Sequence, residues 1–71
     1  MRKNITIKTN GSYHHYRWTS TDKCFYKRSF GMFSSSCSKM GTASSLEDAI
    51  ALAKAACGAS KHADIDISDA R

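Results

Sequence analysis

The chain has 71 residues, of which 41% are hydrophobic, and its formal net charge is +5. This length fits one domain, so we assign residues 1–71 to a single domain. So small a domain buries only about 60% of the surface that its unfolded chain exposes, which leaves little chain for both a core and a walled catalytic cleft. Length and composition therefore favour binding over catalysis, and the absence of proline argues against a disordered linker.

The charge is spread unevenly along the chain. Residues 1–43 contain eight lysines and arginines against one acidic residue, Asp22, whereas residues 44–71 contain three basic and five acidic residues. A basic region of this kind suits a polyanion, such as nucleic acid, or an acidic protein surface. The alternative interpretation is that the charge serves only to keep a small domain in solution.

The first thirty residues predict an antiparallel sheet. Strict alternation places Ile5 and Ile7 on one face of a half-buried strand. Asn10-Gly11 then provides the strongest short hairpin signal, because both residue types tolerate positive φ. Two further runs, each rich in aromatic residues, complete a three-stranded meander. Its strands are predicted over residues 3–9, 13–19 and 24–30.

The clearest element is a helix that starts at the serine pair Ser44-Ser45 and stops at Gly58. Each serine is followed three residues later by Glu47 or Asp48, which is the pattern of a capping box. Apolar residues then recur on one stripe, and glycine supplies a left-handed stop. The residues before the helix, 31–43, have no clear pattern. They fit a continued strand, a small extra hairpin or a plug at one edge of the core, and we predict a loop there with room for a short strand.

Residues 63–68 alternate again, with isoleucines on one face and aspartates on the other, which predicts a fourth strand. Because a crossover helix precedes it, we expect this strand to run parallel to a neighbour. The predicted fold class is α+β: a small β-β-β-α-β domain in which one amphipathic helix packs on one face of the sheet. The predicted core is Ile5, Ile7, Tyr16, Trp18, Tyr26, Phe30, Leu46, Ile50, Ala53, Ile65 and Ile67.

The direction in which each strand residue points decides which side chains are available to a partner. Successive side chains of a strand point to opposite faces, so if Tyr16 and Trp18 face the helix, the residues next to them in the sequence point away from it. In the third strand we place Cys24, Tyr26, Arg28 and Phe30 inward, because that set has the greater apolar bulk. The predicted exposed face then carries Lys8, Tyr13, His15, Arg17, Phe25 and Lys27.

This mixture of cations and rings leads to two hypotheses. In the first, the chain is a non-catalytic binding protein whose exposed face engages a protein partner or a second copy, as in a homodimer. Small phage- or plasmid-type inhibitors that dock on a host complex work in this way. In the second, the face binds DNA or RNA, with cations neutralising phosphate and rings stacking on bases. The same residue types also stabilise a sheet that has no partner at all.

The chain contains no motif for catalysis: it has no GxxxxGK loop, no HExxH and no nucleophile elbow. Cys24, Cys37 and Cys57 are widely spaced, which predicts free thiols rather than disulfides. Adjacent His14 and His15 point to opposite faces of a strand and cannot jointly bind a metal ion. We therefore predict no enzyme activity, no cofactor, no metal and no small-molecule substrate.

The chain start also bears on location. Arg2 and Lys3 are charged, but no apolar run follows them, so we predict no signal peptide. No stretch approaches the roughly 20 apolar residues of a membrane span. The expected location is the cytoplasm, without membrane association.

Overall fold

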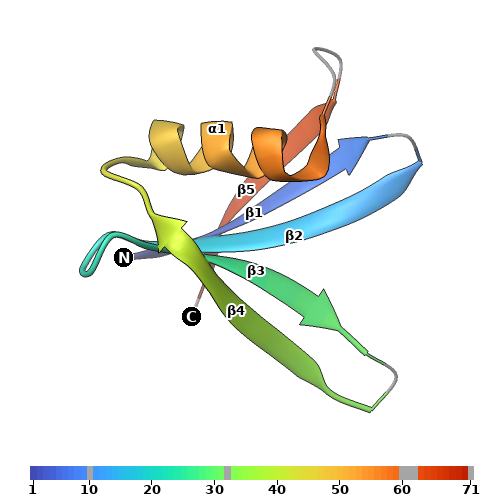
Figure 1. Ribbon diagram of the computed structural model, residues 1–71, viewed down its shortest axis with the longest axis horizontal. Helices are drawn as coiled ribbons and strands as arrows, with labels where there is room; N and C mark the ends of the chain where they lie inside the picture. The colour runs from blue at the N-terminus through green and yellow to red at the C-terminus, as the bar shows by residue number, and fades with distance from the viewer. Residues whose placement is uncertain (10, 32, 60–62, 71) are drawn as a thin grey trace.

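The computed structural model describes residues 1–9, 11–31, 33–59 and 63–70. Within these residues, one helix lies on one side of a five-stranded antiparallel sheet, which confirms the predicted α+β class (Figure 1). The sheet order is β4-β3-β2-β1-β5. The elements are β1 (Arg2–Thr9), β2 (Ser12–Thr19), β3 (Cys24–Phe30), β4 (Ser35–Thr42), α1 (Leu46–Cys57) and β5 (Asp64–Ala70).

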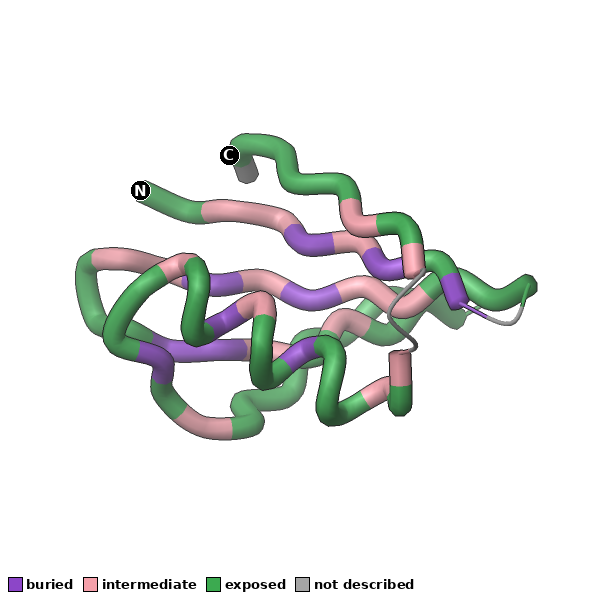
Figure 2. Tube along the Cα trace, turned by 90° about the horizontal axis from the view of Figure 1, so that it is seen from above, coloured by how far each residue is buried: buried purple, intermediate pink, exposed green. Residues whose placement is uncertain are grey.

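The core lies between α1 and the central strands. Figure 2 shows that buried segments concentrate in these strands and in α1, whereas the β3–β4 hairpin is mostly exposed. The helix contributes small side chains, Ala49 and Ala53, which allow it to approach the sheet closely. The sheet contributes larger ones, which fill the space that the alanines leave. These are Ile5, Ile7, Tyr16, Trp18 and Phe25.

The helix starts and stops where the sequence predicts. The side chain of Ser45 accepts a hydrogen bond from the Asp48 backbone N–H at 3.2 Å, and this satisfies one free donor of the first turn. Gly58 ends the helix with a left-handed φ of 65°. Of the helices that the described residues form, none has the length and apolarity to cross a membrane.

The predicted loop over residues 31–43 is wrong in its main part. Residues Ser35–Thr42 form β4, an edge strand that pairs with β3 along its whole length. Nearly all of β4 is exposed on both faces, because α1 covers the middle of the sheet and the hairpin runs away from it (Figure 1). Without a buried face, the strand has no hydrophobic alternation by which the sequence could reveal it.

The predicted direction of the last strand is also wrong, since β5 pairs with β1 in antiparallel fashion. The helix crosses from β4 at one edge to β5 at the opposite edge. These two edge strands run in the same direction, but three strands separate them. The neighbour of β5 is therefore β1, which runs the other way. At this edge Ile67 is 37% exposed, so it is peripheral to the predicted core.

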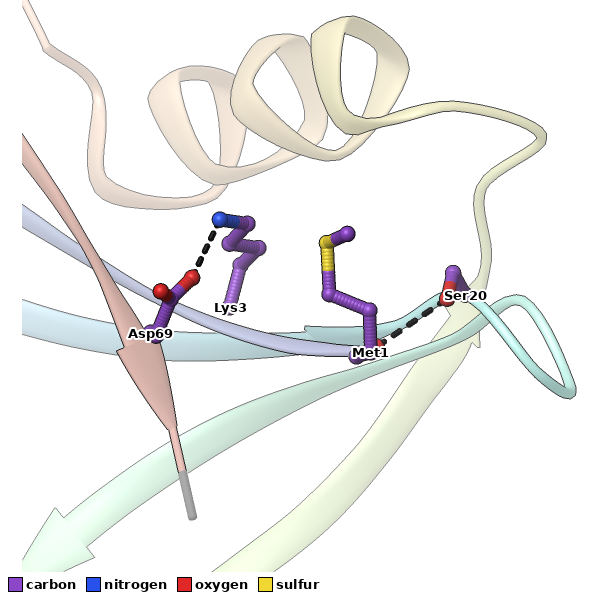
Figure 3. Close-up of polar contacts among 4 residues, drawn as sticks. All are labelled: Met1, Lys3, Ser20 and Asp69. Carbon is purple, nitrogen blue, oxygen red and sulfur yellow. Dashed lines mark hydrogen bonds and ion pairs between the residues drawn. The ribbon is translucent and has the colours of Figure 1, made fainter.

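Polar contacts hold β1 at its first residues (Figure 3). The carbonyl oxygen of Met1 accepts hydrogen bonds from the backbone N–H of Ser20 at 2.8 Å and from its hydroxyl at 3.1 Å. Lys3 forms an ion pair with Asp69 across β1 and β5, on the helix side of the sheet. Hydrogen bonding to the Lys3 ammonium group, together with its charge, lowers the pKa of Asp69.

This ion pair predicts a small, pH-dependent contribution to stability. A lowered pKa in the folded state means that Asp69 stabilises the fold above the usual aspartate range, and that this effect is lost as pH falls through the lowered pKa. We expect Asp69→Asn to reduce the melting temperature at about pH 7 but not at about pH 2, where the carboxyl group is protonated. An equal reduction at both pH values would contradict the ion-pair origin of the effect.

Candidate functional site: the open face of the sheet

The structure reverses the predicted orientation of the third strand. Phe25 is 2% exposed, and its ring stacks on that of Tyr16 with centroids 5.4 Å apart. It therefore faces α1, as does Lys27, which pairs with Tyr16. Paired residues share a face, so the pairing of Trp18 with Phe25 fixes the orientation of the whole strand. Phe25 and Lys27 are thus absent from the exposed face to which the sequence assigned them.

The alternate residues of β3 take their place on the side away from α1. Phe30, predicted in the core, is 55% exposed, and Tyr26 and Arg28 are half-buried on the same side. The sequence could not decide between the two sets, because each contains one cation and at least one aromatic ring. Burial preference offered no signal either, because Lys27 in one set and Arg28 in the other are both rarely buried.

We call the sheet surface opposite α1 the outer face. Four predicted site residues do lie on it: Lys8 and Tyr13 are exposed, and His15 and Arg17 are half-buried. The strand register adds five side chains that sequence reasoning missed. These are Arg2, Tyr26, Arg28, Phe30 and Lys39. The outer face thus has more cations and more rings than the sequence predicted.

Three rings and two cations form a row across three strands of this face. The Lys8 ammonium lies 5.5 Å from the centroid of the Tyr13 ring, which stacks loosely on His15 at 6.5 Å. His15 meets Phe30 edge to face at 4.9 Å, and the Arg28 guanidinium lies 4.9 Å from the Phe30 centroid. We call these five residues the cation–ring row. It brings two elements of the chain, the β1–β2 and β3–β4 hairpins, into one surface.

A shallow hollow of about 250 Å³ lies further along the outer face. Two guanidinium groups, a carboxylate, a hydroxyl, a phenol and a thiol surround it. Cys37 of β4 pairs with Arg28, so the hollow adjoins the cation–ring row. The lining residues are Arg2, Arg17, Thr19, Asp22, Tyr26 and Cys37.

The polar groups of the hollow are held by neighbouring atoms. The Arg17 Nε–H donates to the Asn4 side-chain oxygen at 3.3 Å. One oxygen of Asp22 accepts from the Cys24 backbone N–H at 3.0 Å, and this hydrogen bond lowers the pKa of Asp22. A hydrogen bond with the Cys24 side chain raises the pKa of Tyr26, and burial of the phenol raises it further. Asp22 is therefore ionised, and Tyr26 neutral, at physiological pH.

Apart from Asp22, the acidic residues of the outer face lie at the β5 edge. Asp64 and Asp66 follow the β5 edge, where they pair with Lys8 and Thr6 of β1. Negative charge thus borders the face on one side, while the cations extend from β1 to β4. A polyanion would consequently lie across β1–β4 and avoid β5.

The thiols and histidines form no metal centre within the described part of the chain. No group of three or more potential ligands gathers there. The three cysteines are free thiols, with Cys24 buried, Cys57 half-buried and Cys37 exposed. His62, the third histidine, lies outside the described residues.

No protein family model, curated protein or solved structure matches this chain.

Proposed function

We propose that this protein binds single-stranded nucleic acid on its outer face, without catalysing a reaction. The cation–ring row is the observation that carries the proposal. Its rings are accessible, since Tyr13 is 61% and Phe30 is 55% exposed. Exposed rings on an open sheet provide stacking platforms for bases, and each stacked base contributes about 1–3 kcal/mol. Bases of a duplex are already stacked on one another, so this geometry favours an unpaired strand.

The cations of the outer face fit the same ligand. Lys8 and Arg28 lie over the Tyr13 and Phe30 rings at the two ends of the row, so a base that stacks on either ring would displace these long side chains toward its neighbouring phosphates. Arg2, Arg17 and Lys39 extend the positive surface toward the hollow. Neutralising phosphates releases counterions from the nucleic acid, which makes such binding strongly dependent on salt.

A protein partner or a second copy is a second candidate, and the β3–β4 hairpin favours it. The strand β4 lies at a sheet edge and is exposed on both faces. Apolar side chains accompany it, with Phe33 95% and Met40 49% exposed. Unpaired edge strands can accept a strand from another chain through main-chain hydrogen bonds. A partner bound in this way would leave the cation–ring row unused.

Fluorescence anisotropy with labelled oligonucleotides tests the proposal. Single-stranded thymine and uracil oligomers of about 12 nucleotides should bind with micromolar or tighter affinity, whereas a duplex of the same length should bind more weakly. Engagement of four or five phosphates predicts a loss of affinity of roughly 50- to 130-fold between about 50 mM and about 200 mM salt. Absence of binding at the lower salt concentration would refute the proposal and leave the protein partner or second copy as the leading candidate.

A further inference from the structure

We infer, on the basis of the proposed function, that the hollow beside the cation–ring row accepts one base of the bound strand and selects guanine. The inference rests on the combination of groups that line the hollow. Arg2 and Arg17 offer hydrogen-bond donors with positive charge, whereas Asp22 offers acceptors with negative charge. A ligand that fits must present acceptors and donors together.

This combination argues against a phosphate in the hollow. Two guanidinium groups alone would suit a phosphate, because their paired donors match its oxygens. The Asp22 carboxylate would repel it, since its lowered pKa keeps it ionised. The phosphates therefore lie mainly against the cations outside the hollow, and the hollow is left for a group that is itself uncharged.

Among the four bases, guanine complements these groups most fully. Its O6 and N7 atoms are the acceptors that arginine contacts in a bidentate manner. Its N1–H and N2–H₂ groups are two adjacent donors, which match the two oxygens of a carboxylate. Cytosine, adenine and thymine each lack either the donor pair or the acceptor pair.

The hollow also has room for a purine, and its wall includes an aromatic ring on which the purine can stack. Its volume of about 250 Å³ exceeds the about 150 Å³ of a cavity that accommodates benzene. Tyr26 in the wall supplies an aromatic surface. The base would enter from solvent, as the hollow opens on the uncovered side of the sheet.

Two of the recognising groups, Asp22 and Arg17, are positioned in advance and are not engaged with one another. The Lys3–Asp69 pair is the single ion pair that the described residues form, so the carboxylate of Asp22 remains accessible to a ligand. Its hydrogen bond from the Cys24 N–H fixes one oxygen, and the Asp22 side chain is exposed. Asn4 similarly orients Arg17 by binding Nε, which leaves the terminal nitrogens for the base.

Anisotropy titrations with a single altered base test this inference. The probes are thymine oligomers of about 12 nucleotides that contain one central guanine, inosine, 7-deazaguanine or adenine, beside the unmodified oligomer. Guanine should bind roughly tenfold more tightly than thymine at that position. Inosine lacks the N2 amino group and 7-deazaguanine lacks the N7 acceptor, so each should lose a large part of this preference.

The Asp22→Asn variant tests the carboxylate directly. Asparagine keeps an oxygen for the Cys24 N–H but has one acceptor where aspartate has two, so the guanine preference should fall to about twofold or less. Affinity for the unmodified thymine oligomer should rise, because the variant removes a negative charge from the outer face. Asp66→Asn is the matched control, because it removes the same charge from the same face at the β5 edge, and it should retain the preference. Melting temperatures verify that both variants are folded.

The outcomes separate the two proposals. Equal affinity of the unaltered protein for all five oligomers would overturn the guanine pocket and leave nucleic-acid binding in place. A guanine preference that persists in Asp22→Asn would overturn the role of the hollow. Absence of binding to every oligomer would refute both.

Discussion

Replacing Trp18 with alanine should lower the free energy of unfolding by about 3–5 kcal/mol, the range observed for buried aromatic residues. Trp18 is 5% exposed and belongs to the core cluster. Its indole N–H also donates to the Ala43 carbonyl oxygen at 2.9 Å, which ties β2 to the segment between β4 and α1. Such a loss is a large share of the stability of so small a domain.

Urea denaturation measures this change, and it should be followed by far-ultraviolet circular dichroism because Trp18 is the only tryptophan. Phe33→Ala is the matched control, since this aromatic side chain is 95% exposed and its removal should change stability by less than about 0.5 kcal/mol. Trp18→Phe keeps most of the apolar volume if the alanine variant does not fold. An unchanged unfolding midpoint in Trp18→Ala would contradict the placement of this residue in the core.

The second large effect concerns nucleic-acid affinity. The double variant Arg17→Glu/Arg28→Glu reverses two charges on the outer face, one beside the hollow and one in the cation–ring row. We expect the affinity for single-stranded oligomers to fall at least about 100-fold at low salt, because the phosphate contact at Arg28 becomes repulsive and the positive charge at Arg17 is reversed. The anisotropy titration measures this loss, and an unchanged melting temperature shows that the fold is intact.

The control for this experiment is Lys27→Glu/Lys54→Glu. It changes the net charge equally, but Lys27 points to the helix side of the sheet and Lys54 lies exposed on α1. This variant should lose only the weaker, long-range part of the electrostatic attraction, so the affinity for the oligomer should fall about threefold. Equal losses in both double variants would show that the general charge of the domain, rather than the outer face, binds the ligand.

Local patterns in the sequence predict most of the elements correctly. The alternation around Ile5 and Ile7 marks β1, and the serines before Leu46 mark the start of α1. These predictions succeed because one face of each element is buried, so hydrophobic residues recur in the sequence with the period of a strand or a helix. The predicted turn at Asn10-Gly11 lies partly outside the described residues, while the strands on either side of it do pair as a hairpin.

The site was harder to predict than the fold, because it depends on long-range geometry. The outward direction of Tyr26 and Arg28 follows from pairing with β2, which neither residue reveals by its type. β4 has no buried face, so its position beside β3 left no pattern. The hollow combines residues from β1, β2, β3, β4 and the β2–β3 turn, and no single segment of sequence indicates that they meet.

The position of β1 between β2 and β5 has a consequence for how the chain folds. Pairing with β2 joins residues that are close in sequence, whereas pairing with β5 brings Arg2 beside Ala70 at the far end of the chain. Closing so long a loop costs conformational entropy before any contact compensates for it. We therefore expect the meander of β1–β4 to form early and β5 to dock last, in the rate-limiting step. Folding should be slower than that of helical domains of similar size.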